Sequence, residues 1–336
     1  IRDLVRSRGL GDVYKRQPPR RGRRSPCGRL RPFAQRGSVL GVTLTRRGVC
    51  LLAAAAFHTL PGFGAHAQAG GGREPHSYYG GFRLALQSAC FGRLSLDQAI
   101  GAILGLGIKY CEFSPVHADL ASIETAALRE IRRQFLDAGL SVHTYGVARF
   151  AKSDGRRLQK AFRRAQEFGF TTLLLEADPS LLKELDRLAQ RCRVNAAIHN
   201  AYRDGRGDSP DAIWERIKER SPRCGLALDT ANFLSAGYDP VAAIGKFQGR
   251  ILTVRLGDVA QPGVRCALGR GKADVAAILK ALREQDYDGI LALDAEAAEN
   301  ADEAVSASLA CLKKLTGGRY KLLQNLFGAP SGHDFS

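Results

Sequence analysis

The sequence contains four short apolar segments that each end on a carboxylate or another charge: LLLEAD (173–178), LALDT (226–230), LTVRLGD (252–258) and LALDAE (291–296). Each segment has the length of a fully buried parallel strand and is too short for an independent helix. A helical pattern follows each of the first three. Acidic groups at the C-terminal ends of parallel strands are found where an α/β barrel builds its active site. The four segments therefore predict both the architecture and the location of the chemistry.

The same strand-then-helix unit recurs eight times from Arg83 onward. The predicted strands cover residues 83–89, 109–115, 140–147, 171–178, 195–202, 224–232, 250–258 and 289–296. This alternation requires a parallel sheet, and eight units suit a closed barrel of about 250 residues. We therefore predict an α/β fold, a single-domain (β/α)8 TIM barrel over residues 78–317, with a doubly wound open sheet as the alternative. No glycine-rich loop follows the first strand, so dinucleotide binding of the open-sheet type has no support.

The residues outside the barrel are interpreted as separate segments. Residues 1–41 are interpreted as artefact and upstream translation, because the first 17 resemble a translated sequencing adapter; a basic arm that binds nucleic acid is the alternative. Residues 42–69 contain TRR (45–47), a short apolar stretch and AHA (65–67), which is the order of an export signal. The paired arginines resemble a twin-arginine signal. We expect a periplasmic protein with no membrane segment after cleavage, an uncleaved anchor being the alternative, and a C-terminal tail over residues 318–336.

The basic charge is concentrated before the barrel. The whole chain has a formal net charge of +17, and the residues up to Cys50 hold 14 Lys and Arg against 2 Asp and Glu. That segment accounts for +12 of the total, so the remainder carries only +5. The high net charge is therefore weak evidence for nucleic-acid binding by the barrel, and no nucleic-acid partner is expected.

Six motifs occur in order between residues 82 and 315: LALQSACFGRLSLDQAIGAILGLGIKYCEFSP, LEADPSLLKELDRLAQ, VNAAIHN, SPRCGLALDTANFLSAGYDPVAAI, GRILTVRLGDV and LGRGKADVAAILKAL. Together they resemble the xylose-isomerase-like TIM-barrel superfamily, also called the sugar phosphate isomerase/epimerase family. The resemblance covers essentially the whole predicted barrel. It is specific to the superfamily and not to one substrate.

The resemblance implies a metal site. In active relatives Glu, Asp, His and Glu from strands four, six, seven and eight hold a divalent cation such as Mn, Mg, Co or Zn, while a carboxylate moves a proton through an enediol. Carried over to this sequence, the metal ligands fall on Glu176, Asp229 and Asp294, with Glu296 as a nearby substitute for Asp294. The candidate catalytic residues are Glu176, Asp294, His199 and Glu112.

The strand-seven position departs from the family pattern, because Arg255 stands where the family has His. A guanidinium has no lone pair to give and stays protonated, so it cannot be a metal ligand. Two further family imidazoles are absent, since the DTGH-like motif reads DTAN (229–232) and the IHNH-like motif reads IHNA (198–201). We expect Arg255 to bridge at least one of Glu176 and Asp229. Binding of a divalent metal such as Mn, Mg or Zn is then expected to be weak or absent.

The remaining polar residues have structural alternatives. Candidate substrate-binding residues are Asn232, Arg255 and Asp258, although a purely structural loop role is the alternative for Asp258. The GxG at 269–271 could contact a phosphate or hydroxyl, with a tight turn as the alternative. A buried ion pair with Arg255 is the alternative role for Glu176 and Asp229.

Two functions of different classes are consistent with the sequence. The first is an exported sugar isomerase or epimerase that acts on a small carbohydrate at the C-terminal face of the barrel. The second is a non-catalytic, metal-free barrel that binds a small carbohydrate or polyol. Cleavage of abasic DNA is a weaker third hypothesis, because that branch of the superfamily needs more His ligands.

Overall fold

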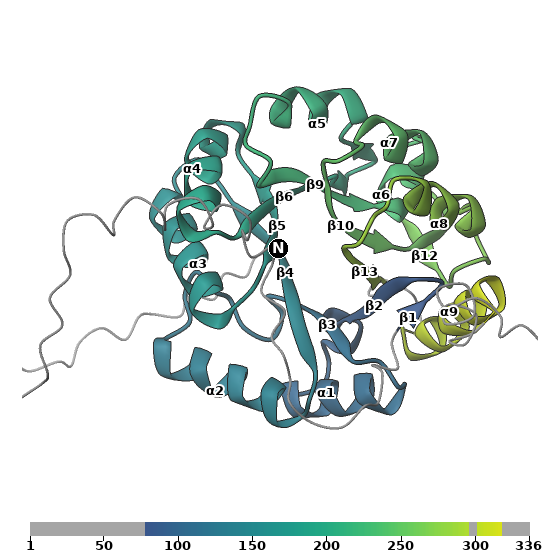
Figure 1. Cartoon of the computed structure of the whole chain (residues 1–336), viewed down its shortest axis with the longest axis horizontal. Coiled ribbons are helices and arrows are strands. Elements are labelled where there is room, and N and C mark those ends of the chain that lie inside the picture. The colour runs from purple at the N-terminus through teal and green to yellow at the C-terminus, as the bar shows by residue number, and fades with distance from the viewer. Residues whose placement is uncertain (1–77, 296–300, 318–336) are drawn as a thin grey trace, which may run out of the picture. The chain divides into compact units, whose positions relative to one another are not determined.

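A computed structural model describes residues 78–295 and 301–317 of the chain. Eight parallel strands form the inner ring (Figure 1), in the order β2-β13-β10-β9-β6-β5-β4-β3. The ring is closed because β3 at the end of this order also pairs with β2. The strands are β2 (Phe82–Gln87), β3 (Tyr110–Phe113), β4 (Ser141–Phe150), β5 (Thr172–Ala177), β6 (Asn195–His199), β9 (Cys224–Asp229), β10 (Ile251–Leu256) and β13 (Ile290–Leu293). The predicted (β/α)8 barrel is confirmed. The segments predicted at 1–41, 42–69 and 318–336 lie outside the described residues, as does Glu296.

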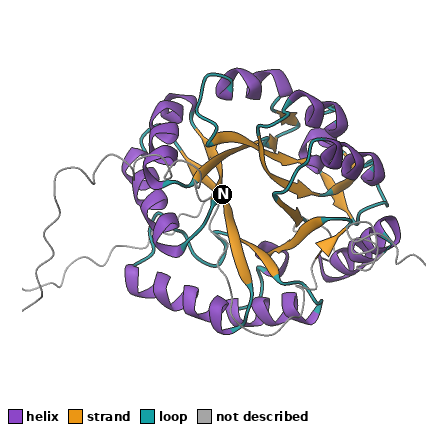
Figure 2. Cartoon of the chain, viewed as in Figure 1, coloured by secondary structure: helices purple, strands orange, loops and turns teal. Residues whose placement is uncertain are grey.

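Helices surround the strands as an outer ring (Figure 2). They are α1 (Leu96–Gly105), α2 (Thr125–Asp137), α3 (Gly155–Phe168), α4 (Leu182–Cys192), α5 (Pro210–Ile217), α6 (Thr230–Ser235), α7 (Pro240–Lys246), α8 (Val275–Glu284) and α9 (Ala301–Thr316), with 3-10 turns η1 (Ser88–Phe91) and η2 (Pro179–Leu181). Local sequence sets their ends: Ser95 and Gln98 form a reciprocal capping box at α1. All six residues of β9 are buried, as expected for a strand covered on both faces.

The strand register brings polar residues to one level at the C-terminal end of the barrel. Gln87 on β2 is paired with Glu112 on β3, and Asp229 on β9 is paired with Arg255 on β10. Because the strands are parallel, these residues and the loops that follow them lie at the same end. The mouth of the barrel is therefore the place to look for a functional site.

Two small hairpins follow strands β6 and β10 and were not foreseen from the sequence. The first pairs β7 (Tyr202–Arg203) with β8 (Arg206–Gly207), and the second pairs β11 (Asp258–Gln261) with β12 (Val264–Cys266). A further short strand, β1 (Tyr78–Tyr79), pairs antiparallel with β2. The hairpins matter because they carry two arginines, Arg203 and Arg265, that line the cavity described below.

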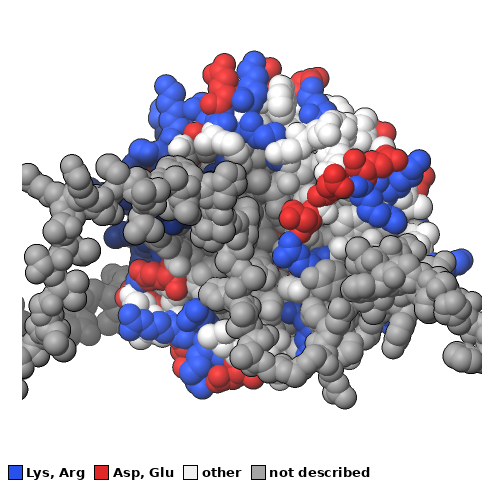
Figure 3. Space-filling view, viewed as in Figure 1, with Lys and Arg blue, Asp and Glu red and all other residues white. Residues whose placement is uncertain are grey.

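The described surface carries both signs of charge. Basic and acidic side chains are interspersed over the described part of the face in Figure 3. Among the described residues, no helix has the length and apolar character needed to cross a membrane. The mixed charge on this face agrees with the small net charge left once the N-terminal segment is set aside.

Gly146 allows β4 to pass close to β5, and its replacement gives a direct test of barrel packing. A Cβ at this position would lie 2.6 Å from both the Cβ and the carbonyl oxygen of Leu174. We therefore expect Gly146→Ala to lower the free energy of unfolding by about 1–3 kcal/mol, measured by urea denaturation. Gly101→Ala in α1 is the matched control, because its Cβ would have no neighbour within 4 Å, and it should raise stability by up to about 1 kcal/mol. Equal stability of Gly146→Ala and the unmodified protein would contradict the packing.

Candidate functional site

A cavity of about 390 Å³ opens at the C-terminal ends of the strands. Five of the residues proposed from the sequence line it: Glu176, His199, Asn232, Arg255 and Asp294. Asp229 and Glu112 are fully buried and are not part of the lining. With Glu112 and Asp229 included, these residues come from six different strands, or from the turns that follow them.

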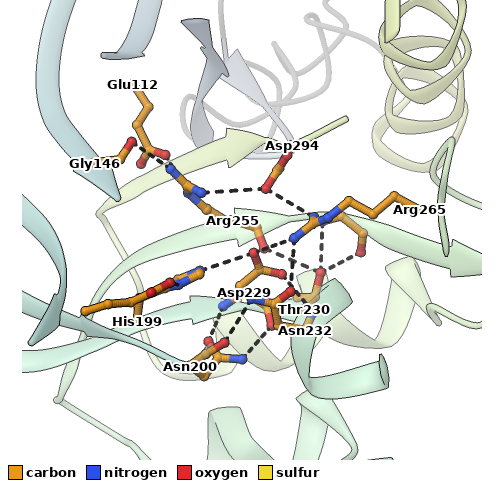
Figure 4. Close-up of polar contacts among 12 residues, drawn as sticks. Glu112, Gly146, His199, Asn200, Asp229, Thr230, Asn232, Arg255, Arg265 and Asp294 are labelled. Atoms are coloured by element: carbon orange, nitrogen blue, oxygen red, sulfur yellow. Dashed lines mark hydrogen bonds and ion pairs between the residues drawn. The ribbon is translucent and has the colours of Figure 1, made fainter. Parts of the chain in front are cut away.

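Arg255 extends from β10 into the barrel interior, with only 5% of its side chain exposed. Its Nε donates to Glu112 Oε1 at 2.6 Å, its Nη2 donates to the carbonyl oxygen of Gly146 at 3.0 Å, and its Nη1 lies 3.8 Å from Asp294 Oδ2. The expected bridge from Arg255 to Glu176 or Asp229 does not form among the described residues. The guanidinium instead reaches across to β3 (Figure 4), and other cations neutralise those two carboxylates.

Gln87 connects Arg255 to Asp294 and was missed in the sequence analysis. Its amide oxygen, turned toward Arg255, accepts from Nη1 at 2.9 Å and from Nη2 at 2.6 Å, and its amide nitrogen donates to Asp294 Oδ1 at 2.9 Å. This orientation places each donor opposite an acceptor. The only signal in the sequence was a polar residue at the end of the first apolar strand, LALQ.

Arg265 on β12 is the second cation of the site, partly buried with 15% of its side chain exposed, and no sequence pattern pointed to it. Its Nη2 donates to Asp229 Oδ2 at 3.0 Å and to Asn232 Oδ1 at 3.1 Å, while its Nη1 lies 3.1 Å from Asp294 Oδ2. Figure 4 shows this guanidinium reaching in toward both carboxylates. Gly257 leaves the space, because a Cβ there would lie 2.8 Å from Arg265 Nη1.

Both carboxylate oxygens of Asp229 and its backbone N–H and carbonyl groups have polar partners. Its Oδ1 accepts from the backbone N–H of Asn232 at 2.9 Å and so caps α6. The Asn200 amide accepts from the Asp229 N–H at 2.7 Å and donates to the Asp229 carbonyl oxygen at 2.9 Å. Burial acts to raise the pKa of Asp229, but the charge of Arg265 and the hydrogen bond with His199 hold that pKa well below its usual range. Asp229 therefore remains an ionised, fully paired carboxylate.

His199 links Glu176 to Asp229. Its Nδ1 lies 3.1 Å from Glu176 Oε1, and its Nε2 lies 3.3 Å from Asp229 Oδ2. Glu176 also accepts from Arg149 Nε at 3.0 Å and pairs with Arg203, both through Oε2. The chain Glu176–His199–Asp229 runs from the cavity wall into the barrel, an arrangement that could move a proton at Glu176.

Glu112, like Asp229, is a fully buried carboxyl of the group. Its side chain has no exposed surface, and Arg255 is its ion-pair partner. Burial raises the pKa of Glu112, and the neighbouring charge of Arg255 opposes that rise. For Arg255 itself, burial acts to lower the pKa, while the charges of Glu112 and Asp294 raise it. Each charge of the pair is therefore stabilised in the barrel interior by the opposite charge of its partner.

Asp258 organises a loop and is not part of the cavity wall. Its Oδ1 accepts from the N–H groups of Val259 at 2.7 Å and Ala273 at 2.8 Å. Its Oδ2 accepts from those of Gly269 at 3.0 Å and Gly271 at 2.9 Å. The contacts of Asp258 agree with a structural role in the loop. The GxG at 269–271 forms a turn around this carboxylate.

A family comparison identifies the barrel. The sequence model described as Xylose isomerase-like TIM barrel matches residues 100–315, which is more than half of the chain. The chain belongs to this family. A comparison with curated proteins found no match.

Solved structures of similar fold include three proteins that this xylose isomerase-like barrel covers almost completely. A xylose isomerase domain protein from Planctomyces limnophilus is 16% identical, with a TM-score of 0.56 over 71% of this chain and 98% of that one. D-allulose 3-epimerase from Methylomonas sp. is 15% identical, with a TM-score of 0.56 over 70% and 98%. An IolI protein with a bound zinc atom is 14% identical, with a TM-score of 0.57 over 74% and 100%. At these identities the likeness shows the fold alone.

The residues of this family member do not fit a divalent metal as the structure places them. Among residues 78–295 and 301–317, no group of three or more His, Cys, Asp and Glu could hold a metal ion. The reason lies in the pairing described above: Arg265 lies between Asp229 and Asp294, and Arg255 is paired with Glu112. A metal ion would have to displace a tethered guanidinium from carboxylates that are at most 2% exposed.

The Glu112–Arg255 pair predicts a pH-dependent loss of stability on removal of one partner. Arg255→Met leaves Glu112 buried without its cation, which should lower the free energy of unfolding by about 3 kcal/mol or more at pH 8. The buried carboxyl then takes up a proton that the unfolded chain, with a pKa of about 4.3, does not hold. The stability of Arg255→Met is therefore greatest below about pH 4.3, and it falls as the pH rises toward the raised pKa of Glu112 in the folded variant.

A double variant supplies the control for that prediction. Arg255→Met/Glu112→Gln carries no unpaired charge, so it should recover most of the stability at pH 8 and lose the extra pH dependence. Urea denaturation of the unmodified protein and both variants between pH 5 and pH 8 measures this. An equal loss in the single and double variants would show that the ion pair is not the cause.

Proposed function

We propose that this protein binds a small carbohydrate or polyol in the cavity at the mouth of the barrel, and that it does so without a divalent metal. The observation that carries the proposal is the position of Arg265, 3.0 Å from Asp229 and 3.1 Å from Asp294. A guanidinium there supplies the positive charge that a metal supplies in relatives that use one. The sugar epimerases among the similar folds support a carbohydrate as the ligand class.

The cavity wall has the chemical character that carbohydrate recognition needs. Polar side chains that can donate to or accept from hydroxyl groups line the cavity, including Asn232 and Asp294. Val116, Val147 and Tyr202 add apolar surface against which the C–H face of a sugar could pack. A few fixed polar groups in a partly apolar pocket are typical of small-molecule sites.

A metal-independent isomerase or epimerase is the second candidate. It is favoured by the Glu176–His199–Asp229 chain, which places a carboxylate oxygen on the cavity wall with an imidazole 3.1 Å behind it. Glu176 would remove a proton from a carbon next to a sugar carbonyl, and the guanidinium of Arg255 or Arg265 would stabilise the developing oxyanion. In a purely binding protein the same groups would only orient hydroxyls.

We also infer that the barrel is exported. The support is the twin-arginine-like pattern in residues 42–69, with TRR (45–47) before a short apolar stretch and AHA (65–67) after it. A barrel that binds its ligand without a metal would be functional in the periplasm whatever the supply of metal ions there.

Calorimetry with a panel of pentoses, hexoses, polyols, sugar acids and sugar phosphates tests the binding function. At least one compound should bind, with a Kd that neither EDTA nor added Mn²⁺ changes by more than about twofold. Asn232→Ala should weaken that binding by about tenfold, the effect of one lost polar contact of about 1.4 kcal/mol. Asn195→Ala is the control, because Asn195 lies at the opposite end of β6, away from the cavity.

The outcomes separate the two candidates. Absence of binding by every compound, or binding that EDTA abolishes and Mn²⁺ restores, would contradict the proposal. For a bound sugar, loss of a C–H signal by proton NMR in D₂O would indicate the isomerase or epimerase, provided that Glu176→Gln stops the exchange. Binding without exchange would indicate the non-catalytic protein.

A further inference from the structure

Two arginines at the rim of the cavity share a single carboxylate oxygen. Arg149 on β4 donates from Nε to Glu176 Oε2 at 3.0 Å, and Arg203 on β7 pairs with the same Oε2 through its Nη2. The other oxygen of Glu176, Oε1, faces His199. Among the groups that form ion pairs with these two arginines, one carboxylate therefore serves two guanidiniums.

The inner part of the site has no such excess of positive charge. Arg255 and Arg265 are matched there by three carboxylates, Glu112, Asp229 and Asp294. The side chains of Arg255 and Arg265 are also only 5% and 15% exposed. The positive excess is thus confined to the rim, where 64% of the Arg149 side chain and 48% of the Arg203 side chain remain exposed.

The rim arginines lie where two cavities meet. The 390 Å³ cavity and a neighbouring one of about 540 Å³ are both lined by Arg149, Glu176, His199 and Arg203. Burial and the nearby charge of Arg149 lower the pKa of Arg203, and the charge of Asp204 opposes that shift. Both guanidiniums contact the same oxygen of Glu176, so they lie close enough to repel each other. A second anion between them would reduce this repulsion.

We propose that the carbohydrate ligand carries an anionic group, a carboxylate or a phosphate, that binds across Arg149 and Arg203. The inference rests on the proposed carbohydrate-binding function and adds the substrate class. Guanidinium groups bind carboxylates and phosphates through pairs of parallel hydrogen bonds, and both rim arginines are accessible from the cavity. The uncharged part of the sugar then extends inward toward Asn232 and Asp294.

Calorimetry with matched compounds tests the charge requirement. The probes are D-glucose, D-glucuronate and D-glucose 6-phosphate, followed by the same comparison on whichever sugar skeleton binds best in the wider panel. The charged member should bind at least about tenfold more tightly than its neutral partner, the effect expected from one charge-assisted hydrogen bond. A preference for glucuronate would identify a carboxylate, and a preference for the phosphate ester would identify a phosphate.

Three variants and one control variant locate the anion. Arg149→Gln and Arg203→Gln should each reduce the charged-to-neutral preference by about tenfold, while Glu176 keeps one arginine partner in either variant. Arg206→Gln is the matched control, because Arg206 lies in the same hairpin, is exposed and lines neither cavity. Glu176→Gln removes the competing carboxylate, so it should increase the preference.

The results distinguish this inference from the function on which it rests. Equal binding of charged and neutral sugars, or a preference that Arg206→Gln reduces as much as Arg203→Gln does, would overturn the anionic-ligand proposal and leave carbohydrate binding intact. Failure of every charged and neutral compound to bind would overturn both. A charged preference lost in both rim variants and increased in Glu176→Gln would establish the rim site.

Discussion

The guanidinium of Arg265 lies between the carboxylates of Asp229 and Asp294, and the rest of the site depends on this interaction. Two carboxylates that are 0% and 2% exposed are costly to keep ionised unless a cation and hydrogen bonds compensate for lost water. Arg265 supplies the charge from a hairpin that is part of the chain, and Gly257 leaves the space for it. Asp229 therefore remains ionised and contacts His199, which in turn positions Glu176 at the cavity wall.

The fold could be predicted because its signals are local. The buried strands are continuous apolar runs, and alternation with helical patterns leaves few topologies besides a closed parallel barrel. The two hairpins could not be predicted in the same way. Their strands are two to four residues long, and residues such as Arg203, Arg206 and Arg265 give them no apolar alternation. As a result, the strand predicted over 195–202 is too long: the strand ends at His199, and the hairpin begins at Tyr202.

The candidate site could be predicted in part, for a reason that belongs to the barrel. Glu176 and His199 lie at the C-terminal ends of apolar strands and Asp294 directly follows one, so the parallel topology alone brings them to one end of the barrel. Which cation pairs with which carboxylate is a different question, because it depends on side-chain direction and on loops. Arg255 turns toward Glu112 across the interior, whereas Arg265 arrives from a hairpin ten residues later in the chain.

The position of Arg255 in the sequence described the site incompletely, because a second arginine also pairs with its carboxylates. Arg255 stands where the resemblance to the family implies an imidazole ligand, yet the guanidinium that pairs with Asp229 is that of Arg265. A return of Arg255 to His would therefore leave the space between Asp229 and Asp294 filled. Both arginines have to change before a cation can enter.

Calorimetric titration of Mn²⁺ into the unmodified protein, Arg255→His and Arg255→His/Arg265→Ala, each checked for native circular dichroism, is the most direct test. If the arginines take the role of the cation, the unmodified protein and Arg255→His should show no measurable binding, and the double variant should bind Mn²⁺. Tight binding of Mn²⁺ by the unmodified protein would contradict this and would restore a metal-dependent site.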